Sequence, residues 1–280
     1  MRRRFSQVDV FASGGFGGNP VAVVHDADGI DDEDMHAFTA WTNLSETTFL
    51  LPPETPGADY RVRIFCPGRE LPFAGHPTLG TCAAWLAAGG TPANADRIVQ
   101  ECGAGLVPIR RDGQRLAFAA PPTIRSGPVE AAELDARLDA LGLRREDLVD
   151  AAWIDNGPGW MGLLLPSAEA VLAVAPPAAP FPEFNVGLLG LHPPGADAAL
   201  EVRGLFADAA GAVREDPVTG SLNASAAQWL LATGRLEAPY VARQGTALGR
   251  AGRVRVDVEG DEVWVGGDVT VTVEGTVALG

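Results

Sequence analysis

The chain has 280 residues and a formal net charge of −15, and all 21 residues counted as lysine or arginine are arginines. This length suits one or two domains with a sizeable core, and 46% hydrophobic with 20% charged residues is typical of a folded globular protein. The absence of lysine excludes a Schiff-base lysine and a P-loop lysine, and the acidic balance is unlike that of nucleic-acid-binding proteins.

Strand and helix signals alternate in the first part of the chain. Acidic residues from Asp31 onward complement the positive end of a helix dipole, and Met35, Phe38 and either Trp41 or Thr42 then recur at helical spacing. Residues 60–65 alternate apolar and polar side chains, as in a half-buried strand. The remaining expected elements are strands at 5–11 and 21–24, a helix after Pro77 and hairpin strands within 97–119.

Proline and glycine residues at 121–128 indicate a linker between two halves. Beyond it we expect helices at about 129–141 and 221–233, and a closing hairpin with a turn at 259–261. The predicted division is therefore residues 1–121, together with a last strand at about 269–280, and residues 122–268.

The two halves resemble each other. Residues 75–86 can be laid on residues 219–230 at an offset of 144, and each segment is a small-residue helix that ends in Trp-Leu. Gly89 and Gly234 follow as helix-closing glycines. This pattern predicts a duplicated α+β unit in which a curved sheet closely surrounds each helix. Both helix starts could offer backbone N–H groups to an anion.

The cysteines and the apolar segments exclude further classes of protein. Cys66, Cys82 and Cys102 form no CxxC pair, so neither a disulfide framework nor a thiolate zinc site is expected. No run approaches the roughly 18 apolar residues of a membrane span, and no apolar run of a secretion signal follows Arg4. We expect a cytoplasmic protein that binds neither nucleic acid nor a membrane.

Four residues could carry acid–base chemistry, and each also has a simpler interpretation. Glu46 is a solvated residue at a strand edge or a general acid/base, and the second role requires burial to raise its pKa. His76 and Asp216 each precede or begin a helix, so each is either a local cap or a site residue. Ser221 is expected to be an N-cap rather than a nucleophile, because no GxSxG motif surrounds it.

Cofactor and metal motifs are not expected in this chain. The glycine-rich run at 14–18 lacks the spacing of a dinucleotide loop, and the four histidines form neither an HxH nor an HExxH motif. The sequence therefore predicts no cofactor and no metal ion.

Several short motifs occur together in one order along the chain. They lie at residues 16–24, 45–49, 70–80, 215–221, 244–245 and 249–250. In this combination the chain resembles the phenazine-biosynthesis isomerase (PhzF-like) family of the diaminopimelate-epimerase-like superfamily, over essentially its whole length.

The resemblance implies an α+β fold of two pseudo-symmetric halves, each a curved, mostly antiparallel, barrel-like sheet around a central helix. It also implies an active site between the halves, proton transfer without a cofactor, and a homodimer. The catalytic residues that it implies are Glu46, His76 and Asp216. The substrate-binding residues are expected to be Asn19, Ser45, Gly75, Gly220 and Ser221.

The implied activity is a proton and double-bond shift in a small unsaturated amino or carboxylic acid, in secondary-metabolite biosynthesis. A two-thiol racemase mechanism is not expected, because Ala74 and Asp216-Pro217 occupy the regions where related epimerases carry cysteines. Two alternatives stay open. One is an epimerase or related lyase that uses the same glutamate, and the other is a catalytically silent homologue that binds a small acid.

Overall fold

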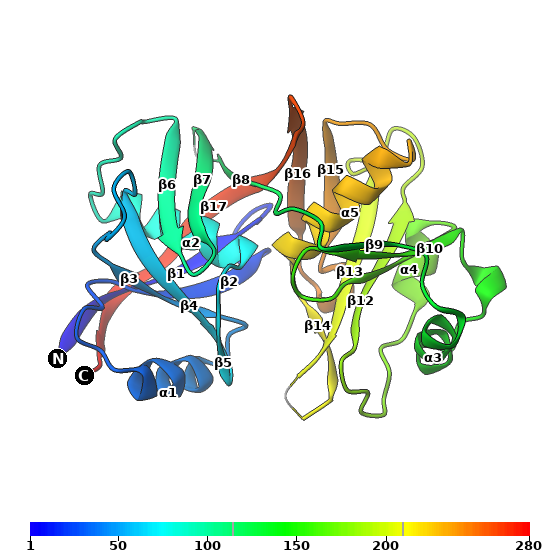
Figure 1. The fold of residues 1–280 in the computed structure, drawn as a ribbon, viewed down its shortest axis with the longest axis horizontal. Coiled ribbons are helices and arrows are strands. Elements are labelled where there is room, and N and C mark those ends of the chain that lie inside the picture. The colour runs from blue at the N-terminus through cyan, green and yellow to red at the C-terminus, as the bar shows by residue number, and fades with distance from the viewer. Residues whose placement is uncertain (114, 209) are drawn as a thin grey trace. The chain divides into compact units, whose positions relative to one another are not determined.

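The computed structural model describes residues 1–113, 115–208 and 210–280. Backbone contacts divide the chain into two compact units. Unit 1 comprises residues 1–119 and 266–280, and unit 2 comprises residues 120–265. In Figure 1 the elements of unit 1 run from blue to green and include the red end of the last strand.

Eight strands of unit 1 pair in a closed ring. Their order is β1-β2-β3-β4-β6-β7-β8-β17, and β17 pairs with β1 to close the ring. The pairs β2–β3 and β4–β6 are parallel. The strands are β1 (Arg2–Val10), β2 (Asn19–Val24), β3 (Thr47–Leu51), β4 (Tyr60–Cys66), β5 (Arg69–Leu71, paired with β4), β6 (Arg97–Cys102), β7 (Gly105–Asp112), β8 (Arg115–Ala119) and β17 (Glu262–Ala278).

The strands of this ring surround helix α2 (Gly75–Ala87), which contacts β1, β2, β3, β6 and β8. All residues from Gly75 to Cys82 are buried. A Cβ atom on Gly80 would overlap Val21 and would lie 3.1 Å from Cγ2 of Val10. The small residues predicted for this helix are therefore required by its close approach to the strands.

Helix α1 (Asp32–Thr42) packs on β3 and β4 and buries Met35 and Phe38. It begins as predicted, because Asp31 is the N-cap and its carboxylate accepts the Asp34 N–H at 2.8 Å. Trp41 and Thr42 were the alternatives for continuing the buried face of this helix after Phe38, and Trp41 is wrong. It is 75% exposed and stacks on Phe38 at the edge of the helix, with 6.1 Å between ring centroids.

Unit 2 repeats the order of elements. Its strands pair as β9-β10-β11-β12-β13-β15-β16, with β14 on β13, and the pairs β11–β12 and β13–β15 are parallel like their counterparts. The strands are β9 (Arg125–Gly127), β10 (Asp150–Asp155), β11 (Met161–Leu165), β12 (Asn185–Leu191), β13 (Leu200–Ala207), β14 (Val213–Asp216), β15 (Tyr240–Gln244) and β16 (Gly252–Glu259). The helices are α3 (Ala131–Leu141), α4 (Ala168–Ala173) and α5 (Gly220–Ala232), with 3₁₀ turns at Arg145–Asp147 and Thr246–Leu248.

Helices cover both faces of the unit 2 sheet. On one face α5 lies against β10, β12 and β16, and a Cβ atom on Gly187 of β12 would overlap Leu222 of α5. On the other face a Cβ atom on Gly190 would lie 2.7 Å from Cγ2 of Val171 in α4. The predicted α+β fold of two curved sheets, each around a central helix, is confirmed. None of the helices in the described ranges is long and apolar enough to cross a membrane.

The sequence located two boundaries imprecisely. Helix α2 begins at Gly75 rather than after Pro77, because Pro77 is accommodated in the first turn, where its missing N–H has no helical partner to lose. The expected linker contains strand β9, because residues 125–127 pair with β10. Gly89 and Gly234 close the central helices as predicted, at φ +95° and +67°.

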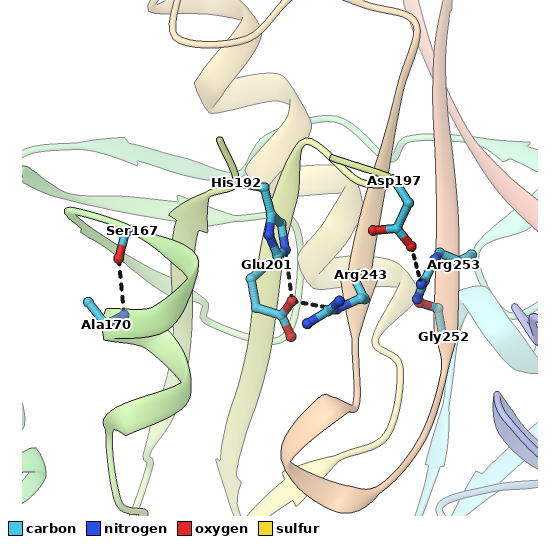
Figure 2. A network of polar contacts seen from close by, with 8 residues as sticks. All are labelled: Ser167, Ala170, His192, Asp197, Glu201, Arg243, Gly252 and Arg253. Atoms are coloured by element: carbon cyan, nitrogen blue, oxygen red, sulfur yellow. Dashed lines mark hydrogen bonds and ion pairs between the residues drawn. The ribbon is translucent and has the colours of Figure 1, made fainter. Parts of the chain in front are cut away.

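A buried polar network fixes the parallel pair β13–β15 (Figure 2). Glu201 is fully buried, and its Oε2 accepts from Nε of Arg243 at 2.8 Å and lies 3.0 Å from Nε2 of His192. A buried carboxylate is tolerated when such partners surround it. Nearby, Arg253 on β16 donates to Asp197 at 2.6 Å. Because Glu201 and Arg243 are directly paired, the network sets the register of β15.

Replacing Gly80 with alanine tests the close approach of α2 to the strands. We expect Gly80→Ala to lower the free energy of unfolding by about 1–3 kcal/mol, because an added methyl group overpacks the core. The control is Gly275→Ala in β17, where a Cβ atom meets nothing within 4 Å, and its effect should stay within about 0.5 kcal/mol. Urea unfolding measures the stability of both variants. A Gly80→Ala variant as stable as Gly275→Ala would contradict the close approach of α2 to the strands.

Candidate functional site

Unit 1 brings Glu46, His76 and Asn19 together. Glu46 lies between α1 and β3, and His76 is the second residue of α2. Oε2 of Glu46 is 3.3 Å from Nε2 of His76, and Nδ2 of Asn19 is 3.4 Å from Nδ1 of His76. The side chains of Glu46 and His76 are 17% and 5% exposed. The backbone of Glu46 contacts β2, where its carbonyl accepts the Ala22 N–H at 3.5 Å.

The surroundings of His76 keep its ring uncharged. Nδ1 lies against Nδ2 of Asn19, and Nε2 faces Oε2 of Glu46. Burial lowers the pKa of His76 to about 3, so the imidazole is neutral at pH 7. Glu46 thus lies beside a neutral imidazole rather than a cation.

Two further predicted residues lie beside these groups in the sequence. Ser45 precedes Glu46 and is half-buried, and Gly75 is the buried first residue of α2. The N-cap of α2 is Ala74, whose side chain cannot accept from the first backbone N–H groups of the helix. This agrees with the expectation that the helix start offers N–H groups to an anion.

Unit 2 brings Asp216, Gly220 and Ser221 together at the start of α5. Asp216 ends β14, and its Oδ2 accepts from the hydroxyl of Thr219 at 2.6 Å. Asp216 is buried, with 8% of its surface exposed. The hydroxyl oxygen of Ser221 accepts from Nε1 of Trp160 at 3.0 Å.

The prediction that Ser221 caps α5 is wrong. Thr219 occupies the N-cap position, and no side-chain hydrogen bond caps the helix. The hydroxyl of Thr219 bonds to Asp216 instead, and Ser221 lies inside the first turn. Like α2, helix α5 therefore begins without a side-chain cap.

The cysteines do not provide a proton-transfer pair. Burial raises the pKa of Cys82 to about 12 and also raises the pKa values of Cys66 and Cys102. Their thiols are therefore protonated near neutral pH. Over the described ranges, no three or more histidine, cysteine, aspartate or glutamate side chains gather as a set of metal ligands.

Sequence reasoning missed the residues that hold the start of α5. The sequence places Gln244 in one of the motifs and suggests Asn223 as a pocket residue, but it predicts no role for either residue, or for Thr219, in holding this helix. A usable signal was present, because Gln244 follows Gln100 at the same offset of 144 as the two central helices. Both glutamines are fully buried.

Comparisons with known proteins agree with the fold and the motifs. Residues 8–279 match the sequence profile of the PhzC-PhzF family, described as phenazine biosynthesis-like protein. The chain is 36% identical over 269 residues to trans-2,3-dihydro-3-hydroxyanthranilate isomerase of Pseudomonas aeruginosa, covering 92% of this chain and 91% of that protein. It is 35% identical over 294 residues to antisense-enhancing sequence 1 of Schizosaccharomyces pombe, covering 97% of each.

A solved structure described as a predicted epimerase from Pseudomonas aeruginosa is 31% identical, has a TM-score of 0.80 and covers 99% of this chain and 100% of that one. The fold and the relatives together define an enzyme of the isomerase class. The chain belongs to the phenazine biosynthesis-like family. The resemblance found in the motifs and the predicted enzyme class are both confirmed.

The neutral state of His76 predicts a pH-dependent stability. Between about pH 6.5 and pH 3 an unfolded histidine binds a proton that folded His76 does not, so the free energy of unfolding falls as the pH falls. This group contributes a slope of at most about 1.4 kcal/mol per pH unit.

The variant His76→Asn removes that contribution. The stability difference between wild type and variant should shrink by about 2 kcal/mol from pH 7 to pH 5, measured by urea unfolding. A difference that is the same at both pH values would contradict a neutral, buried His76.

Proposed function

We propose that the chain is a cofactor-independent isomerase that moves a proton and a double bond in a small unsaturated amino or carboxylic acid. The observation that carries this proposal is the pair of Glu46 and His76, a carboxylate 3.3 Å from a buried neutral imidazole. A partly buried carboxylate beside an uncharged polar group can serve as a general base and then as the conjugate acid.

In this mechanism Glu46 takes a proton from an activated carbon of the substrate. It returns the proton to a second carbon of the conjugated system on the same face, and the double bond moves in the opposite sense. Both carbons must come within about 3 Å of the carboxylate. His76, being neutral, does not hold the carboxylate as one half of an ion pair. Asn19 contacts the other ring nitrogen of His76.

Asp216, Gly220 and Ser221 are proposed to bind the polar groups of the same substrate. The hydroxyl oxygen of Ser221 already accepts from Trp160, so its proton can be donated to a carboxylate. The uncapped starts of α2 and α5 add backbone N–H groups that stabilise negative charge as it develops. Ser45 and Gly75, beside Glu46 and His76, are proposed to contact the substrate as well.

The first substrate to test is trans-2,3-dihydro-3-hydroxyanthranilate, because the isomerase relative named for it is 36% identical across 92% of this chain. We place the reaction in secondary-metabolite biosynthesis and the enzyme in the cytoplasm as a homodimer. Epimerisation with the same glutamate is a second candidate, favoured by the 31% identical structure described as a predicted epimerase.

The variant Glu46→Gln tests the base. The wild type is incubated with candidate unsaturated acids in deuterated water, and NMR measures the deuterium incorporated into each acid. We expect stereospecific uptake. Glu46→Gln should reduce uptake and turnover by about 10²–10⁴-fold, because the general base is lost. The control is Glu33→Gln, an exposed substitution in the first turn of α1, which should behave like wild type.

The position of the deuterium separates the candidates. Uptake at a different carbon from the one that lost the proton supports the double-bond shift, and uptake at the same carbon with inversion supports epimerisation. Stereospecific uptake that survives in Glu46→Gln contradicts the assignment of the base. Binding without exchange for every acid that binds favours a silent small-acid-binding protein.

The variant Ser221→Ala tests the proposed anion contact. Loss of one hydrogen bond to a substrate carboxylate should raise KM by roughly 10-fold and change kcat little, because the contact is made in both ground and transition states. Ser225→Ala is the matched control one turn later on α5, where the hydroxyl bonds only to helix carbonyl groups. An unchanged KM in Ser221→Ala would contradict the contact.

A further inference from the structure

The side chain of Gln244 joins four groups around the end of β14 and the start of α5. It is fully buried at the last position of β15. Its Oε1 accepts from the backbone N–H of Thr219 at 3.0 Å and from Nδ2 of Asn223 at 2.8 Å. Its Nε2 donates to the carbonyl of Asp216 at 3.2 Å and to the hydroxyl oxygen of Thr219 at 2.9 Å.

These contacts fix the direction of every proton in the network. The Thr219 N–H can only donate and the Asp216 carbonyl can only accept, so the amide of Gln244 has one orientation. Since Nε2 donates to the hydroxyl oxygen of Thr219, that hydroxyl directs its own proton elsewhere. It donates to Oδ2 of Asp216 at 2.6 Å, a distance typical of a hydrogen bond to a charged oxygen.

Gly204 on β13 leaves room for this network. A Cβ atom there would lie 2.7 Å from the Thr219 hydroxyl and 3.3 Å from Nε2 of Gln244. Two more glycines allow backbone to pack closely next to it, because a Cβ atom on Gly245 would lie 2.6 Å from the Pro217 carbonyl and one on Gly252 would lie 2.7 Å from the Gln244 carbonyl.

Unit 1 contains the same amide with different partners. Gln100 lies 144 residues earlier, also fully buried, and donates to the hydroxyl of Thr78 at 2.9 Å. Its Oε1 accepts from the Tyr60 hydroxyl at 3.1 Å. The buried amide thus contacts the central helix in both units, and in unit 2 its partner Thr219 bonds in turn to a carboxylate.

We propose that Thr219 and Gln244 are positioning residues for Asp216. The amide sets the orientation of the hydroxyl, and the hydroxyl holds the carboxylate of Asp216 in one rotamer with Oδ2 as an acceptor. Thr219 is at the N-cap of α5, yet its hydroxyl makes no capping bond, so helix capping does not account for it. The inference rests on the proposed role of Asp216 in the reaction.

The activity test compares Thr219→Val, which keeps the shape of the side chain, with Thr219→Ser, which keeps the hydroxyl. We expect Thr219→Val to lower kcat by about 10- to 100-fold, because a hydrogen bond to a charged group is lost, with a smaller change in KM. Thr219→Ser should restore most of kcat. The control is Thr233→Val at the far end of α5, where the hydroxyl bonds to the Trp229 carbonyl.

Two outcomes of this comparison overturn the proposal. One is a kcat of Thr219→Val equal to that of wild type. The other is a Thr219→Ser variant as impaired as Thr219→Val, because the effect would then follow packing rather than the hydroxyl.

A second measurement needs no substrate. Amide hydrogen–deuterium exchange over residues 216–223 should be faster in Gln244→Leu than in wild type, because the Thr219 N–H loses its acceptor. Gln100→Leu is the matched control and should leave exchange over this segment unchanged. Unchanged exchange in Gln244→Leu overturns the positioning role.

The activity measurements and the exchange measurements distinguish a failure of the proposed function from a failure of the positioning role. If wild type isomerises no acid while the exchange result is as expected, the proposed function fails and the ordering of Asp216 stands. If wild type is active and Thr219→Val matches it, the positioning role fails and the proposed function stands. Should Gln244→Leu not fold, the kcat comparison of Thr219→Val with Thr219→Ser tests the positioning role by itself.

Discussion

The structure depends on the close approach of strands to a central helix in each unit. Ordinary side chains do not fit at the points of closest contact, so glycine occupies position 80 on α2 and position 187 on the strand that faces α5. This packing fixes the direction of each helix and buries its first turn. The candidate site residues lie in or beside those first turns, so their geometry follows from the packing of the helices.

Burial also decides the charge state of the groups beside Glu46. An imidazole enclosed with α2 would have to give up its hydration to become charged, and the pKa of His76 falls to about 3 as a result. The same enclosure keeps the Cys82 thiol protonated. With no lysine in the sequence, carboxylates remain candidates for moving a proton.

Much of this could be read from the sequence because it depends on local pattern. The alternation of residues 60–65, the acidic start of α1 and the helix-closing glycines are local signals, and each is confirmed. The offset of 144 pointed to repeated units, although the boundaries at 121/122 and about 268/269 stay predictions. The roles of Glu46, His76 and Asp216 stay predictions too, supported by their positions within each unit.

The errors arose where tertiary contacts override local preference. Ser221 was expected to cap α5 because serine often does so, but Trp160 and the turn at Asp216 determine how the hydroxyls are used. Trp41 fits the helical spacing of Met35 and Phe38, but its side chain lies outside the face of α1 that packs on the strands and is exposed. The contacts of Gln244 join residues more than 20 positions apart, and no window of sequence contains them all.

The two buried glutamines, one in each unit, have different hydrogen-bond partners. Gln100 on β6 and Gln244 on β15 are buried amides 144 residues apart, and the register of β15 is held from its other face by Glu201 and Arg243. With the strand and the amide alike in both units, the difference lies in the residues around the helix start. The hydrogen bonds of Gln100 reach Thr78 and Tyr60, whereas those of Gln244 reach Thr219, whose hydroxyl donates to Asp216. A few residues at a turn are therefore enough to change what one buried amide connects.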